Sequence, residues 1–257
     1  MNILFIGDIM GRAGREYLQE YFHHFIVHYQ IDFSIANIEN AAGGFGLTPE
    51  IAEGLFSLGL NVLTSGNHIW DRKEIVEYIK KEKKLLRPAN YPLSVPGSGS
   101  YVGVSRHGVK VGVINLSGRI FMESLDCPFQ VSKREIEEVK RHTNNIIVDF
   151  HAEATSEKIA MGWYLDGEVS AVIGTHTHVQ TSDERILPAG TAYITDVGMT
   201  GSFDSVIGIT KEVAISRFLT RMPIRFSVAK NDRRVSAVIL IIDDHSGRAL
   251  DIRRIQF

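Results

Sequence analysis

The chain has 257 residues, of which 44% are hydrophobic and 23% charged, with ten His and a single Cys. This composition supports a large buried core and excludes a largely disordered chain. The formal net charge of -2 argues against a broad basic face for duplex DNA, but it allows a nucleotide-sized ligand. Cys127 has no partner for an internal disulfide, and no apolar run reaches the roughly 18 residues that span a bilayer. We therefore expect a reduced cytoplasmic protein with no membrane partner.

The first part of the chain alternates short apolar runs with amphipathic stretches, which is typical of βαβ units. In chain order we expect strand 3–6, helix 15–29, strand 33–38, helix 49–58, strand 62–64 and helix 71–84. The proline- and glycine-rich stretch 87–99 indicates an irregular loop.

The rest of the chain continues with alternating elements and then changes character. We expect a hairpin of 101–105 and 109–115, helix 132–142, strand 146–150, helix 156–165, strand 171–173 and strand 192–195. The segments 224–229, 235–242 and 249–255 alternate apolar and polar residues, which predicts an antiparallel meander. The pattern predicts an α/β fold of two mixed sheets packed face to face with helices outside. We expect one domain over 1–257, with a small loop or cap insert around 197–223.

Polar side chains follow five of the expected strands, where each strand ends. They are Asp8, Glu39, Asn40, Asn67, His68, His151, His176 and His178. Ligands of open α/β sheets bind outside the carboxyl ends of the strands, so we expect these side chains to converge on one site. Carboxylate, amide and imidazole ligands without a thiolate suit Mn, Fe or Zn rather than a structural zinc site. There are enough ligands for two ions roughly 3.5–4 Å apart, the arrangement that assists phosphoryl displacement.

Each of these residues alone has a structural explanation. Asp8 could cap a helix, Asn67 could satisfy a turn, and His151 could be a hydrogen-bonded core imidazole. These explanations do not account for a metal-ligand type at the end of every one of these strands. The glycines Gly11 and Gly14 do not form a P-loop, because no Lys-Ser/Thr follows them.

Seven sequence blocks resemble those of the calcineurin-type metallophosphoesterases, and more closely those of the bacterial YmdB-like phosphodiesterases. The blocks are GDIMGRAGR, NIENAAGGFG, TSGNHIWD, RPANYP, DFHAEATSEK, GTHTHVQT and ITDVGMTG. The resemblance covers essentially the whole chain, since the final meander is also similar to the end of the family. It implies a four-layer α-β-β-α sandwich of two mixed sheets flanked by helices.

The resemblance also implies roles for the predicted ligands at a dinuclear site. Asp8, Asn40 and His178 would bind the first ion. Asn67, His151 and His176 would bind the second ion, and Glu39 would bridge the two. His68 matches the position that protonates the leaving group or steadies the phosphoryl oxygens.

The chain departs from the wider superfamily at the first ion. Met10 stands where most members have His, and Glu39 stands where they bridge with Asp. Asn40 would replace the missing imidazole with an amide oxygen, which favours Fe or Mn, with Zn and Mg as alternatives. Ser202 stands where the closer family leads us to expect Pro, a change in a loop rather than at a ligand.

We expect hydrolysis of a phosphodiester by attack of a metal-bound hydroxide, and the resemblance implies 2′,3′- and 3′,5′-cyclic nucleotides as substrates. The candidate substrate-binding residues are Arg12, Phe45, Thr175, Thr181 and the segment 196–203. Two alternatives stay open: a phosphomonoesterase or nucleotidase on the same site, and a regulatory, RNA-associated binding protein with non-catalytic metals. The resemblance also implies a homo-oligomer.

Overall fold

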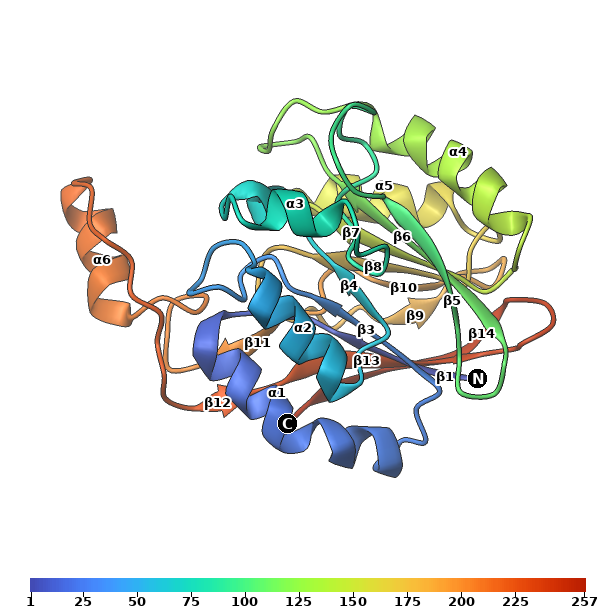
Figure 1. Cartoon of the computed structure of the whole chain (residues 1–257), viewed down its shortest axis with the longest axis horizontal. Coiled ribbons are helices and arrows are strands. Elements are labelled where there is room, and N and C mark those ends of the chain that lie inside the picture. Colours follow the sequence, from blue (N-terminus) through green and yellow to red (C-terminus); the bar gives the residue numbers. More distant parts are fainter.

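The computed structural model describes all 257 residues and shows two large β-sheets between layers of helices (Figure 1). The first sheet has five strands. In spatial order they are β14 (Ala249–Gln256), β13 (Ser236–Ile242), β1 (Asn2–Ile6), β3 (Phe33–Asn37) and β4 (Val62–Thr64). The strands β1, β3 and β4 run parallel, whereas β13 is antiparallel to both β1 and β14.

The second sheet has six strands and is also mixed. In spatial order they are β5 (Ser100–Val104), β6 (Lys110–Ser117), β7 (Ile146–His151), β8 (Ala171–Thr175), β10 (Ala192–Ile194) and β9 (Arg185–Ile186). A small third sheet, absent from the sequence prediction, joins β12 (Arg233–Arg234), β11 (Met199–Ser202) and β2 (Asp8–Ile9).

Six α-helices and one 3₁₀-helix connect the strands. They are α1 (Gly11–His28), α2 (Pro49–Leu58), η1 (Asn67–Trp70), α3 (Ile75–Ile79), α4 (Pro128–Lys140), α5 (Thr155–Tyr164) and α6 (Lys211–Thr220). None of these helices is both long and apolar enough to cross a bilayer. Capping residues set both ends of α2: the Thr48 hydroxyl accepts from the Ile51 amide at its start, and Gly59 adopts a left-handed φ of 116° at its end.

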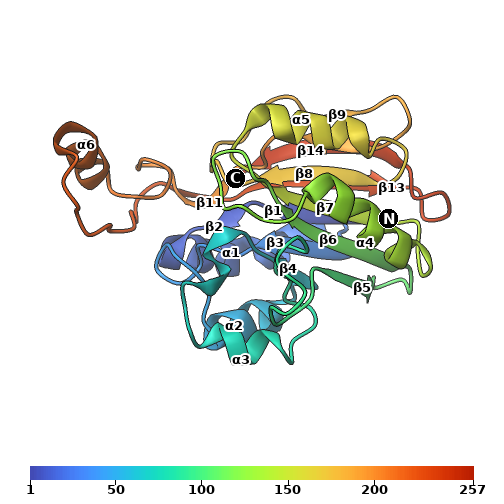
Figure 2. The ribbon, with the colours of Figure 1, turned by 90° about the horizontal axis from the view of Figure 1, so that it is seen from above.

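The layers are held together by three apolar cores, and β1 contributes to two of them. Its residues Leu4 and Ile6 pack beneath α1 and α2, whereas Ile3 and Phe5 face the space between the two sheets. This alternation follows from the two-residue period of a strand. A third core lies between the second sheet and the helices α4 and α5, which lie against that sheet in Figure 2. The four-layer α-β-β-α sandwich expected from the sequence is confirmed.

The predicted helix 71–84 is wrong in extent, since only Ile75–Ile79 is helical. Arg72 donates hydrogen bonds to the carbonyls of Phe45 and Ala42, which ties the start of the segment to a loop instead of a helix. After the helix the chain turns so that Leu85 can bridge to Leu63.

The predicted strand 224–229 is also wrong. The segment makes a single bridge, between Val228 and Ile209, and forms no strand. It instead returns from α6, which projects from the body of the molecule (Figures 1 and 2). The segment 197–223, where we expected a small insert, contains β11 and α6.

We predict that the core between the sheets contributes strongly to stability. Leu240 is fully buried there, so Leu240→Ala should lower the free energy of unfolding by about 2–5 kcal/mol in urea titrations. Leu250 is 62% exposed on the neighbouring strand, and Leu250→Ala should change that value by less than about 0.5 kcal/mol. Equal effects of the two substitutions would contradict this assignment of the core.

Candidate metal centre

The predicted ligands lie where strands of both sheets end. Asp8 follows β1 and begins β2, Glu39 and Asn40 follow β3, and Asn67 follows β4; the strands β1, β3 and β4 belong to the first sheet. His151 ends β7 and His176 follows β8, both in the second sheet. Because the parallel strands of the two sheets deliver these residues to a common edge, the site spans the sandwich.

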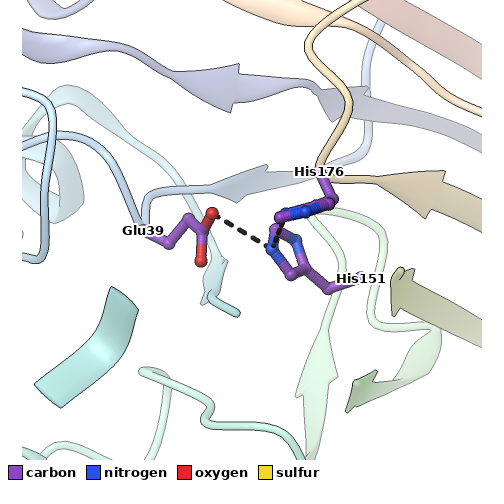
Figure 3. A group of neighbouring side chains, drawn as sticks. All are labelled: Glu39, His151 and His176. Carbon is purple, nitrogen blue, oxygen red and sulfur yellow. Dashed lines mark hydrogen bonds and ion pairs between the residues drawn. The ribbon is translucent and has the colours of Figure 1, made fainter. Parts of the chain in front are cut away.

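The first ligand group surrounds the Nε2 atom of His151. This atom lies 3.0 Å from Glu39 Oε1 and 3.0 Å from His176 Nδ1 (Figure 3). It also lies 3.2 Å from Asn67 Oδ1. A ring nitrogen carries at most one proton, so it cannot satisfy three acceptors. The remaining lone pairs face one another in a buried site, and a cation among them would relieve this repulsion.

The second group contains Asp8, Glu39 and His178, whose ligand atoms all lie within 4.8 Å of one another. His178 Nε2 lies 3.1 Å from Asn40 Oδ1, and the Asn40 amide nitrogen donates to the Gly44 carbonyl, which directs the amide oxygen into the site. The Oδ1 atom of Asp8 is buried without any hydrogen-bond partner. A buried carboxylate oxygen without a donor is costly unless a cation neutralises it.

The two groups share Glu39, and together they fit two metal ions. The donors are carboxylate oxygens, amide oxygens and imidazole nitrogens, which suit first-row transition metals. The lone Cys127 is not part of either group.

Hydrogen bonds fix which nitrogen of each imidazole is available to a metal. The Nδ1 atom of His178 donates to the Ile207 carbonyl at 2.9 Å, and His151 Nδ1 donates to the Thr175 hydroxyl at 2.9 Å, which leaves both Nε2 atoms free. His176 is reversed, since its Nε2 pairs with the Glu153 carboxylate at 3.1 Å and its Nδ1 faces His151. Such outer partners are typical of metal-bound histidines.

A buried polar chain lies beneath His151. The Thr175 hydroxyl donates to Asp149 Oδ1 at 2.7 Å, and Asn37 Nδ2 donates to Asp149 Oδ2 at 3.0 Å. Burial raises the pKa of Asp149 to about 6. The chain from Asp149 through Thr175 therefore holds the His151 ring with its proton on Nδ1.

The charges of the site point to the same need for a cation. Burial would raise the pKa of Glu39, but the positive charge of His151 outweighs it and lowers the pKa to about 2. Burial would lower the pKa of His151, but Glu39 and Asp8 outweigh it and raise the pKa to about 9. Burial raises the pKa of Asp8, and burial together with the charge of His151 lowers the pKa of His176 to about 3. A positive charge at His151, carried by a proton or by a metal ion, stabilises the Glu39 carboxylate.

The backbone of the His176–His178 segment is strained. His176 has a φ of 105° and His178 a φ of 65°, in a region that non-glycine residues rarely occupy. Two carboxylates hold this conformation: Asp8 Oδ2 accepts from the His176 amide, and Asp196 Oδ2 accepts from the Thr177 amide, both at 3.0 Å. Strain maintained by buried partners is typical of functional sites.

Gly66 allows the two sheets to approach at the site. A Cβ atom at this position would lie 2.2 Å from His151 Nε2 and 2.4 Å from Glu39 Oε2. The φ of Gly66 is -148°, so the position demands glycine for space rather than for backbone conformation.

The residue predicted to be catalytic lies at the edge of the metal centre. The backbone amide of His68 donates to Glu39 Oε2 at 3.1 Å, and its side chain is 28% exposed. Its Nδ1 lies 2.8 Å from Asp71 Oδ2, and the Phe45 ring packs edge-on against the imidazole at 5.1 Å between centroids.

The other predicted substrate-binding residues are scattered. Thr175 is fully buried, with its hydroxyl used by Asp149 and His151. Thr181 donates to Asp183, and Arg12 is 81% exposed on α1 with only a 3.9 Å contact to Glu16. No contact joins Arg12 or Thr181 to the metal ligands.

Sequence reasoning missed several supporting carboxylates, including Asp71 and Glu153 described above and the buried Asp149 and Asp196. Asp149 lies two residues before His151 in β7, so both side chains share one face of the strand. This spacing could have revealed it. Asp196, placed by the sequence only in a pocket-lining segment, forms a buried ion pair with Lys158 at 2.6 Å. This ion pair could not be predicted from the sequence, because Lys158 and Asp196 lie far apart along the chain.

The sandwich and its buried ligand groups define an α/β protein of the calcineurin-like phosphoesterase type. The chain belongs to the family of YmdB-like proteins, whose model matches residues 4–255. The resemblance expected from the sequence blocks is therefore confirmed.

Relatives and solved structures match almost the whole chain. It is 50% identical over 255 residues to a 2′,3′-cyclic-nucleotide 2′-phosphodiesterase of Bacillus subtilis, covering 99% of this chain and 96% of that protein. It is 35% identical to a putative phosphatase/phosphodiesterase of Mycoplasma genitalium, covering 100% of this chain and 92% of that protein. Two crystal structures superpose over the full chain with a TM-score of 0.93. One is a hypothetical protein from Thermus thermophilus (40% identity, 99% of that chain), and the other a novel phosphatase from Mycoplasma pneumoniae (36%, 93%).

We predict that Gly66→Ala abolishes metal binding, because the new methyl group would displace the His151 ring and the Glu39 carboxylate. Metal content by inductively coupled plasma mass spectrometry should fall well below that of the wild type. The matched control is Gly54→Ala, since nothing lies within 4 Å of a Cβ there. Undiminished metal content in Gly66→Ala would refute the placement of the site.

We also predict that Thr175→Val weakens metal binding by about 10–100-fold, because it removes the hydroxyl between Asp149 and His151 while keeping the side-chain shape. Competition with a chromogenic chelator would measure the affinity. Thr200→Val is the control, since the buried Thr200 hydroxyl has no partner to lose. The positioning role of Thr175 fails if both variants bind metal as the wild type does.

Proposed function

We propose that this protein is a metal-dependent phosphodiesterase that hydrolyses cyclic nucleotides, with 2′,3′-cyclic and 3′,5′-cyclic forms as substrates. The observation that carries the proposal is the buried pair of ligand groups that share Glu39. The 50% identity to a 2′,3′-cyclic-nucleotide 2′-phosphodiesterase supports the substrate class. The acceptor-rich site supports metal chemistry rather than a covalent nucleophile.

The proposed ligands divide between two ions. Asp8, Asn40 and His178 would hold the first ion, Asn67, His151 and His176 the second, and Glu39 would contact both. When bound, two such ions activate water at neutral pH and neutralise charge on the phosphoryl oxygens. We propose Fe or Mn as the ions, because Asn40 contributes a hard amide oxygen.

His68 is the proposed proton donor to the leaving oxygen. Asp71 accepts a hydrogen bond from His68 Nδ1–H and would stabilise a positive charge on the ring. The proton on Nε2 is then the one that the ring can donate to the substrate. The ring is partly exposed beside the ligands, so a substrate oxygen could reach it.

A phosphomonoesterase is the second candidate function. It is favoured by the names of two relatives, the putative phosphatase/phosphodiesterase of Mycoplasma genitalium and the novel phosphatase of Mycoplasma pneumoniae. A binding protein with non-catalytic metals is the third, and the complete ligand set argues against it. The cytoplasmic location, the absence of duplex DNA as a partner and the homo-oligomer stay predictions.

We predict that the protein loaded with Mn²⁺ hydrolyses 2′,3′-cyclic nucleotides and bis-p-nitrophenyl phosphate faster than p-nitrophenyl phosphate. His68→Ala should lower kcat on cyclic nucleotides by about 10²–10⁴-fold. It should have a much smaller effect on bis-p-nitrophenyl phosphate, because p-nitrophenolate leaves without a proton. Asp8→Asn should lower the turnover of both diesters, because it replaces a charged carboxylate ligand with a neutral amide.

His107→Ala is the control for these variants, since His107 lies in an exposed turn far from the ligands in sequence and is 66% exposed. Metal content should be unchanged in His68→Ala. Faster turnover of the monoester would favour the nucleotidase, and no turnover of any ester by metal-replete protein would favour the binding protein.

A further inference from the structure

Two aromatic rings and an arginine line up beside the proposed proton donor. The Phe45 ring contacts His68, and its centroid lies 5.9 Å from that of Phe226, with the planes tilted by 34°. The Arg217 guanidinium covers Phe226 at 4.6 Å from the ring centroid. We call Phe45, Phe226 and Arg217 the aromatic wall. Both rings are half-buried, so each keeps surface that a ligand can contact.

Hydrogen bonds hold Phe226 in place although its neighbours in sequence are exposed. The Thr210 amide donates to the Ser227 carbonyl and the Ala229 amide donates to the Gly208 carbonyl, both at 2.9 Å. Next to this ladder, Val228 lies so close to Gly44 that a Cβ there would approach it to 3.1 Å. The segment that carries Phe226 is therefore packed against the loop that carries Phe45.

The same projecting segment also contacts the metal ligands. The Ile207 carbonyl accepts the Nδ1 proton of His178, which orients that ring toward the site. The Ile207 side chain is 51% exposed, and its backbone has an unfavourable φ of 46°. Burial of the side chain therefore does not explain this backbone conformation. The base of the projection thus forms one side of the metal centre, and the aromatic wall extends from it.

We propose that the aromatic wall stacks the base of a nucleotide whose phosphate lies at the metal centre. This inference rests on the phosphodiesterase function proposed above and adds how the nucleoside part is recognised. Stacking on an aromatic ring tolerates every base, because each base has a π-face, and Arg217 adds a cationic plane. Because stacking on these two apolar rings does not depend on the base edge, we expect purine and pyrimidine nucleotides both to be substrates.

The test compares nucleotides with a substrate that has no base. The probes are 2′,3′-cyclic AMP, 2′,3′-cyclic CMP and glycerol 1,2-cyclic phosphate, which has the same five-membered cyclic diester. In the wild type, kcat/KM should be about 5–100-fold higher for both nucleotides. Phe226→Leu keeps an apolar side chain without a ring, and it should bring this ratio close to one through KM. Phe226→Tyr should restore the ratio.

The matched control is Phe218→Ala, since Phe218 lies on α6, is 73% exposed and has no aromatic contact with the wall. Its ratio should equal that of the wild type. A ratio near one in the wild type, or a ratio that Phe226→Leu leaves intact, overturns the aromatic wall while the phosphodiesterase function stands.

Equilibrium binding decides the question without turnover. Calorimetry should show that adenosine 3′-monophosphate binds the Mn²⁺-loaded wild type more tightly than glycerol 2-phosphate, and that Phe226→Leu removes the difference. If no ester is hydrolysed but this difference is present, the proposed function fails and the aromatic wall stands. Equal binding of the two phosphates to the wild type overturns the wall.

Discussion

The geometry of the metal centre depends on several hydrogen-bond acceptors that surround the buried Nε2 atom of His151. His151 Nε2 meets oxygen and nitrogen lone pairs from Glu39, Asn67 and His176, and no protein donor can satisfy them all. A metal ion bound among these atoms would supply the positive charge that the arrangement needs. The local features of the site follow from this constraint, including the space at Gly66 and the strained backbone at His176.

Several side chains aimed at the centre are oriented by partners behind them. Thr175 and Asp149 orient His151, and the Ile207 carbonyl orients His178. The Lys158–Asp196 pair holds the backbone between His176 and His178. Because these partners come from both sheets and from the base of the projection, the geometry of the site is a property of the whole fold and not of a single loop.

The sequence predicted the sandwich well because strand alternation and strand-end ligands are local signals. It could place Asp8, Glu39 and His151 at strand ends without knowing which strands are neighbours. It failed where distant contacts override local preference. Arg72 donates to the carbonyls of a loop some 30 residues earlier, and this shortens the helix that its own segment predicts. Phe226 is brought beside Phe45 by hydrogen bonds between its segment and the residues around Gly208, which lie far from it in sequence. The small sheet of β2, β11 and β12 was missed because its strands are too short to show a period.

The pairing of β1 with β13 has a consequence for the order of events during synthesis. On one side β1 is paired only by Ser236–Ile242, which leave the ribosome long after it. The first sheet therefore cannot close on a nascent chain that still lacks β13, although His178, the last ligand along the chain, emerges well before that strand. A product truncated before β13 would therefore carry every ligand but lack one of the two strands that pair with β1.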